Sequence, residues 1–92
     1  MNPPDFDTFC SQARAEGFDE MLERHWEPHT VVDTHTHPFV VKALVTRGQM
    51  WLTVNGQTQA LLPGDGFRLA LNEPHEERYG PEGATFWVAR KN

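Results

Sequence analysis

The sequence predicts a single all-β domain, a small antiparallel β-barrel or sandwich that follows a short N-terminal α-helix. A chain of 92 residues has the length of one domain, and seven glycines and seven prolines favour many turns over a few long helices. After Gly17, apolar and polar residues alternate, and turn residues interrupt them about every eight positions, as is typical of antiparallel barrels and sandwiches. We therefore expect a helical segment over residues 1–18 and a barrel over residues 19–92.

The first segment has the apolar spacing of an amphipathic helix. Four of its residues fall at offsets of 0, 3, 4 and 7 and would share one helix face: Phe6, Phe9, Cys10 and Ala13. Asp5 can cap the first turn with its side chain, and Gly17 can end the helix. The sequence therefore predicts a short helix between Asp5 and Gly17.

Eight strands are expected along the rest of the chain. Apolar alternation places them near residues 19–26, 30–36, 39–46, 49–54, 57–62, 66–71, 75–79 and 84–90. Asn55 and Gly56 form the clearest hairpin, because a two-residue turn needs two positions that tolerate positive φ. Further turns are expected where Gly and Pro occur, at residues 47–48, 63–66 and 80–83.

Charge and composition argue against several classes of partner. The formal net charge is −5 and the eight basic residues are scattered, so no basic stripe is available for phosphates. No apolar run approaches the roughly 20 residues that span a bilayer. The N-terminal sequence lacks the basic and then apolar pattern of a secretory signal, and the single Cys10 cannot form an internal disulfide. We therefore expect neither nucleic acid nor membrane as a partner, and a cytoplasmic setting.

Two histidines, His35 and His37, lie one residue apart in a stretch that otherwise resembles a strand. Side chains on a strand alternate between faces, so the two imidazoles would lie on one face about 7 Å apart, at roughly 3.3 Å per residue. Burying them is unfavourable unless each finds a partner, and a divalent cation bound by neutral imidazole is one such partner. A His-x-His pair alone is weak evidence, because ordinary hydrogen-bonded histidines also occur at this spacing.

The spacing around these histidines resembles the two motifs of the cupin superfamily. The first motif has a Gly, five residues, His-x-His, three or four residues, Glu, six residues and Gly; the second has a Gly, five residues, Pro-x-Gly, two residues, His, three residues and Asn. The matching positions are His35, His37, Gly48, Gly64 and His75. The predicted hairpin lies between the motifs, and the resemblance covers residues 26–90. It implies a cupin barrel, of the jelly-roll or double-stranded β-helix type, that holds a divalent metal ion through His35, His37 and His75.

The sequence also departs from these motifs. Val41 stands where the family has its Glu ligand, and Ala70, Asn72 and Tyr79 replace the Pro, Gly and Asn of the second motif. Three neutral imidazoles would leave the full charge on the metal, which makes it a stronger Lewis acid. Such a site favours Zn, Ni, Fe or Cu over Mn, which prefers oxygen ligands.

Glu77 and Tyr79 are the candidates for catalytic residues. Strand alternation places both on the same face as His75. A buried Glu77 would be a fourth ligand or a general base, whereas an exposed Glu77 would pair with Arg78 or Arg68. We expect the exposed form, and an open coordination position that takes substrate, water or O₂.

Three functions remain open at this stage. The first is an enzyme, a metal-dependent dioxygenase or an isomerase or lyase that acts on a small polar molecule. The second is a non-catalytic, sugar-binding module that resembles the ligand-binding half of sugar-responsive transcription factors, in which the histidines can persist without metal. The third is a structural or storage relic without a ligand. We further expect a homodimer in which the N-terminal segment or the first strand crosses to the partner.

Overall fold

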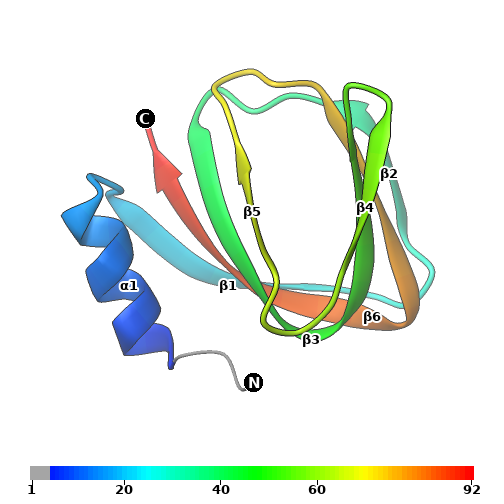
Figure 1. Ribbon diagram of the computed structural model, residues 1–92, viewed down its shortest axis with the longest axis horizontal. Helices are drawn as coiled ribbons and strands as arrows, with labels where there is room; N and C mark the ends of the chain where they lie inside the picture. Colours follow the sequence, from blue (N-terminus) through cyan, green and yellow to red (C-terminus); the bar gives the residue numbers. More distant parts are fainter. Residues whose placement is uncertain (1–4) are drawn as a thin grey trace.

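Six antiparallel strands and one helix make up residues 5–92, the part of the chain that the computed structural model describes (Figure 1). In chain order they are α1 (Phe6–Ala15), β1 (Glu20–Trp26), β2 (Val31–His35), β3 (Val40–Val54), β4 (Gln57–Leu61), β5 (Gly66–Leu69) and β6 (His75–Lys91). The all-β architecture and the short N-terminal helix are confirmed. In this range no helix has the length and apolar character needed to cross a bilayer.

Two long strands organise the sheet. The order is β1-β6-β3-β4, and β6 and β3 pair along most of their length. The first half of β3 pairs on its other side with β5, and its second half pairs with β4. In the same way β6 pairs first with β2 and then with β1. Each long strand thus joins two short ones and bends the sheet into a barrel (Figure 1).

The prediction of eight strands is wrong at two places, because β3 and β6 each replace two predicted strands. The turn expected at residues 47–48 is a pair of register shifts within β3, where Gly48 has a φ of +77°. The turn expected at residues 80–83 is an irregular bulge within β6, since Tyr79 pairs with Met50 and Ala84 pairs with Gly48, which leaves residues 80–83 opposite Gln49 alone. A bulge and a hairpin both use glycine at positive φ, so the sequence does not distinguish them.

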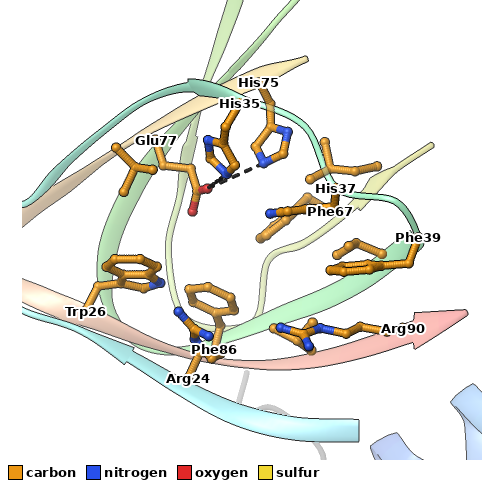
Figure 2. Close-up of a pocket in the computed structure, with 14 residues that line it drawn as sticks. Arg24, Trp26, His35, His37, Phe39, Phe67, His75, Glu77, Phe86 and Arg90 are labelled. Carbon is orange, nitrogen blue, oxygen red and sulfur yellow. Dashed lines mark ion pairs between the residues drawn. The ribbon is translucent and has the colours of Figure 1, made fainter. Parts of the chain in front are cut away.

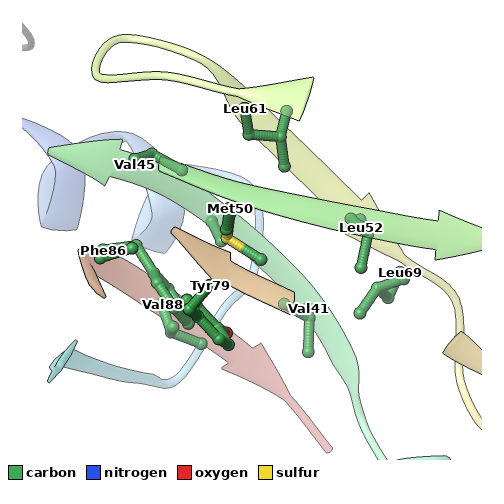
Figure 3. Close-up of a cluster of buried hydrophobic side chains, with 11 residues drawn as sticks. Val41, Val45, Met50, Leu52, Leu61, Leu69, Tyr79, Phe86 and Val88 are labelled. Carbon is green, nitrogen blue, oxygen red and sulfur yellow. The ribbon is translucent and has the colours of Figure 1, made fainter. Parts of the chain in front are cut away.

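The barrel interior is a cluster of buried side chains (Figure 3). Its members are Val41, Ala43, Val45, Met50, Leu52, Leu61, Leu69, Tyr79, Ala84, Phe86 and Val88. Val45 and Met50 have no exposed surface. Four members of this cluster also line a cavity in the barrel: Val41, Leu69, Phe86 and Val88. The core therefore supports one wall of that cavity.

The helix α1 covers the outer face of the sheet beside β1 and the end of β6 (Figure 1). The Asp5 side chain accepts a hydrogen bond from the Thr8 amide at 2.8 Å, as expected of its cap. Glu16 at the end of the helix pairs with Lys42 and Arg68, and these cations hold the pKa of its carboxyl well below the usual value. The apolar helix face buries Phe9, Cys10 and Ala13 against this sheet.

This packing bears on the expected homodimer. The apolar face of α1 packs against the sheet of its own chain, so the helix does not by itself require a partner subunit. The dimer therefore stays a prediction, which light scattering can test.

Candidate metal centre

The three motif histidines converge at one end of the barrel (Figure 2). His35 ends β2 and is the register partner of His75, the first residue of β6. The ring centroids of His35 and His75 are 4.2 Å apart, and the ring of His37 is 4.9 Å from each of them. One nitrogen from each ring lies within 4.8 Å of the other two. The motif spacing of His35, His37 and His75 therefore brings three imidazoles to one point.

Two positive-φ residues shape the chain around these histidines. His29 (φ 59°) occupies the first glycine position of the first cupin motif, and Asn72 (φ 58°) replaces the second glycine of the second motif. The Asn72 amide donates a hydrogen bond to the His37 carbonyl at 2.8 Å. His37 lies beyond the end of β2, so strand alternation does not place its side chain as predicted. The contact with the Asn72 turn fixes its backbone instead.

Backbone carbonyls set the tautomers of two of the imidazoles. The Nδ1–H of His35 donates to the Asp33 carbonyl at 2.8 Å, and the Nδ1–H of His75 donates to the Glu73 carbonyl at 2.9 Å. A carbonyl only accepts, so in the neutral rings each Nε2 carries a free lone pair. The Nε2 of His75 is buried and has no hydrogen-bond partner within the described part of the chain. An unpartnered, buried lone pair of this kind fits a metal ion. The two carbonyls fix the orientation of the rings, as hydrogen-bond partners of metal-binding histidines commonly do.

Glu77 lies beside the histidines and is only 7% exposed. Its Oε2 is 3.4 Å from Nε2 of His35 and 3.5 Å from Nε2 of His75 (Figure 2). Its Oε1 accepts a hydrogen bond from the Tyr79 hydroxyl. Glu77 therefore brings a carboxylate to the cluster from the strand that carries His75.

The expectation of an exposed Glu77 is wrong. Arg78 places its guanidinium over the Trp51 ring, and Arg68 pairs with Glu16 near the helix, so neither arginine reaches Glu77. Strand alternation correctly placed Glu77 on the same face as His75. The sequence could not show that this face is the interior of the barrel at this point.

The cluster perturbs the titration of its members. Burial by itself would raise the pKa of Glu77, but His75, the Tyr79 hydroxyl and the charge of His35 together hold that pKa below its usual value. Burial would lower the pKa of His75, but Glu77 and the Glu73 carbonyl raise it above its usual value. Burial, with the charges of His75 and His35, lowers the pKa of His37. Glu77 is thus anionic near neutral pH and is the negative partner of the imidazoles.

Tyr79, the second catalytic candidate, lies behind Glu77 and does not line the cavity. Its side chain is buried and stacks on Trp26 with a centroid distance of 5.4 Å. Burial and the neighbouring Glu77 raise the pKa of the Tyr79 hydroxyl far above its usual value. Tyr79 therefore stays protonated and orients Glu77, which is a positioning role.

A cavity of about 300 Å³ opens from this cluster into the barrel. Its apolar walls combine aromatic residues, Trp26, Phe39, Phe67 and Phe86, with the aliphatic residues Val32, Val41, Leu69 and Val88. Arg24 and Arg90 line it as well, and the sequence analysis did not identify either as a site residue. The available signal was the alternation of β1, which places Arg24 on the same face as Leu22 and Trp26. Arginine at such a position is usually taken for a surface residue.

The comparisons with known proteins agree with the geometry. Residues 20–89 match a family described as the AraC-like ligand binding domain. No curated protein matches the chain.

Several solved structures share the fold. The DMSP lyase DddQ from Ruegeria pomeroyi DSS-3 has a TM-score of 0.72 at 18% identity, over 78% of this chain and 37% of that one. The cupin domain of Cnp3 from Schizosaccharomyces pombe has a TM-score of 0.74 at 11% identity, over 84% and 55%. The polyketide cyclase RemF from Streptomyces resistomycificus has a TM-score of 0.65 at 26% identity, over 84% and 58%. The chain thus spans little more than a third of the lyase and just over half of the other two.

Proposed function

The chain belongs to the family of AraC-like ligand binding domains and has the cupin fold, and from that premise we propose that it binds one divalent metal ion and a small molecule together. The metal ligands are His35, His37 and His75, with Glu77 as the fourth. The small molecule occupies the cavity beside them.

The observation that carries this proposal is the unpartnered Nε2 of His75 among three other donor groups. Two ligand atoms bound tetrahedrally to one Zn²⁺, each at about 2.05 Å, stand about 3.4 Å apart. Oε2 of Glu77 is 3.4 Å and 3.5 Å from the Nε2 atoms of His35 and His75. These spacings support Glu77 as a ligand beside His35 and His75, in preference to the open position that the sequence favours. Glu77 is not part of the group of donor atoms that all lie within 4.8 Å of one another, which holds the three histidines alone, so it would have to move closer to His37 when a metal binds.

The ligand set bears on the choice of metal. Three imidazoles favour Zn, Ni, Fe or Cu, and we keep these four as the candidates. The Glu77 carboxylate lowers the formal charge of the centre from +2 to +1, so the objection to Mn²⁺ is weaker than for three imidazoles alone.

The residues around the proposed metal centre then have distinct roles. A metal ion held by these residues would supply Lewis-acid chemistry. The Asp33 and Glu73 carbonyls orient the rings of His35 and His75 so that each Nε2 is free to bind it. Tyr79 keeps a proton on its hydroxyl and holds Glu77 in place. The aromatic walls exclude water from the part of the ligand that lies away from the metal.

An enzyme is the first candidate, either a metal-dependent dioxygenase or an isomerase or lyase on a small polar molecule. The cavity beside the donor set supports it, because a small molecule there would lie next to the metal, which it could reach by adding a fifth ligand or by displacing Glu77. The similarity to a polyketide cyclase at 26% identity supports testing isomerisation and ring closure as well as oxygen uptake.

A non-catalytic binding module is the second candidate, and the family description favours it. In that case the metal and cavity hold a ligand, such as a sugar, without turning it over. Oxygen uptake and product analysis with candidate thiols, acids and sugars separate the candidates, because only an enzyme consumes the compound that it binds.

Metal analysis tests the bound metal ion, which both candidate functions assume. We expect about one equivalent of Zn, Ni, Fe or Cu per chain, and loss of nearly all of it in the double variant His35→Ala with His75→Ala. His25→Ala is the matched control, since His25 is exposed and bonds to Thr85 away from the cavity. Full occupancy in the double variant, or no binding by the wild type after incubation with zinc, would overturn the proposal.

A further inference from the structure

Two arginine side chains enter the cavity across from the histidines (Figure 2). Arg24 comes from the middle of β1, and Arg90 comes from the end of β6. The proposed metal centre consists of the three histidines and Glu77, and neither arginine is among its ligands. The two guanidinium groups therefore need a separate explanation.

Strand geometry directs both arginines inward. Arg24 lies between Leu22 and Trp26 on β1, and both of these neighbours pack against the barrel core. Arg90 follows Phe86 and Val88 at the same period of two, and both of those are core residues. β1 and β6 are paired neighbours, so the two arginines share one wall.

The arginines also retain unused hydrogen-bond donors. Within residues 5–92, no carboxylate lies within ion-pair distance of Arg24, whose guanidinium rests over the Trp26 ring at 5.1 Å. Arg90 donates from Nη1 to Glu20 at 3.0 Å, but its Nε is buried without a partner. A buried donor without a partner costs about 1–3 kcal/mol, so a ligand that accepts from it gains affinity.

The charges that line the cavity favour an anion. Arg24 and Arg90 are its cations, and Glu77 is its only carboxylate among the described residues. Glu77 is held by Tyr79 and the histidines, so it does not neutralise the arginines. Arg90 is already paired with Glu20, so Arg24 supplies the unpaired positive charge of this wall, in a chain whose formal charge is −5.

We infer that the small molecule is a carboxylic acid whose carboxylate lies between Arg24 and Arg90, with an apolar body against the aromatic walls and its other end at the histidines. Guanidinium groups bind carboxylates through paired donors. A cavity of about 150 Å³ holds one benzene ring, so about 300 Å³ suits a ring or short chain that carries the acid. This inference deepens the proposed function and rests on it only for the end at the metal.

The test compares acids with their uncharged amides. Benzoate, phenylacetate and 3-phenylpropionate are titrated calorimetrically against benzamide, phenylacetamide and 3-phenylpropionamide, with zinc-loaded and metal-free wild type. We expect at least one acid to bind at least tenfold more tightly than its amide in both forms. Equal affinity of all three acids and their amides, or no binding by any acid, would overturn the inference.

Variants identify the groups responsible. Arg24→Gln should abolish the preference for the acid, and Arg24→Lys should retain part of it because the charge remains. Arg47→Gln is the control, since Arg47 is exposed outside this cavity and its replacement removes the same charge. A preference that survives in Arg24→Gln would overturn the inference.

The metal-free arm separates this inference from the proposed function. If the chain binds no metal but prefers acids through Arg24, the metal proposal fails and the anion site stands. If the preference is present with zinc and absent without it, the metal holds the acid, and the anion site is wrong.

Discussion

Glu77 changes the chemistry expected of the centre. Val41 occupies the motif position of the family's carboxylate ligand and presents an apolar side chain to the cavity. Two residues after His75, Glu77 brings a carboxylate to the same cluster from a different strand. The proposed centre would thus keep three histidines and one carboxylate, with the carboxylate supplied by Glu77 on β6 instead of by the residue at position 41 on β3.

Glu77→Gln tests this assignment at the level of one residue. The amide keeps the size of the side chain but loses the negative charge, so we expect zinc affinity to fall by roughly tenfold or more, the scale seen even for outer-shell partners. Glu76→Gln should leave affinity unchanged, because Glu76 is exposed and points to the opposite face. Competition with a zinc indicator at one pH measures both, and equal affinity in the two variants would remove Glu77 from the ligand set.

At this scale the sequence predicts some residues better than others. The three histidines stand at motif spacing, so their convergence could be predicted without a structure. The burial of Glu77 and the inward direction of Arg24 depend on which face of a strand meets the cavity. That depends on how distant strands pair, and the local sequence does not contain it.

At the scale of elements, the bends of β3 and β6 decide the shape of the barrel. A Cβ atom on Gly48 would lie 2.1 Å from the carbonyl oxygen of Gly83. A Cβ atom on Gly83 would lie 2.3 Å from the carbonyl oxygen of Trp26. Three backbones therefore approach one another here more closely than any side chain permits, and glycine is required for contact as well as for positive φ.

Gly48→Ala should consequently destabilise the fold far more than Gly56→Ala. Both glycines have a positive φ, of 77° and 76°, but a Cβ on Gly56 would meet nothing within 4 Å. We expect Gly56→Ala to cost about 1–2 kcal/mol from its backbone conformation alone, and Gly48→Ala about 3 kcal/mol or more. Urea unfolding of the two variants measures this difference, and equal losses would show that the close approach is not limiting.

The strand predictions differ in quality for a physical reason. The hairpin at Asn55 and Gly56 is local, and the structure has β3 and β4 on either side of it as predicted. The bulges at Gly48 and at residues 80–83 are defined by pairing between β3 and β6, which are distant in sequence. Turn residues in the sequence indicate that the chain bends. Whether the chain reverses direction in a hairpin or continues through a bulge depends on the strand with which it pairs.

For the whole molecule, the barrel assembles one cavity from residues far apart in the chain. β2, the loop after it and the start of β6 supply the histidines and Glu77, and β1 and the far end of β6 supply the arginines. β6 thus contributes to both ends, because its 17 residues run through the whole barrel. The fold class followed from alternation and turn spacing, whereas the cavity and its charges emerged only when the strands were placed together.

X-ray absorption spectroscopy of the zinc-loaded protein tests the central claim, a centre built from three histidines and Glu77, most directly. The account predicts a first shell at about 2.0–2.2 Å with the multiple scattering of three imidazoles and one further oxygen from a carboxylate. In Glu77→Gln the three imidazoles should remain while the carboxylate contribution disappears. A wild-type spectrum with fewer than two imidazoles, or the same spectrum from the double variant His35→Ala with His75→Ala, would contradict the account.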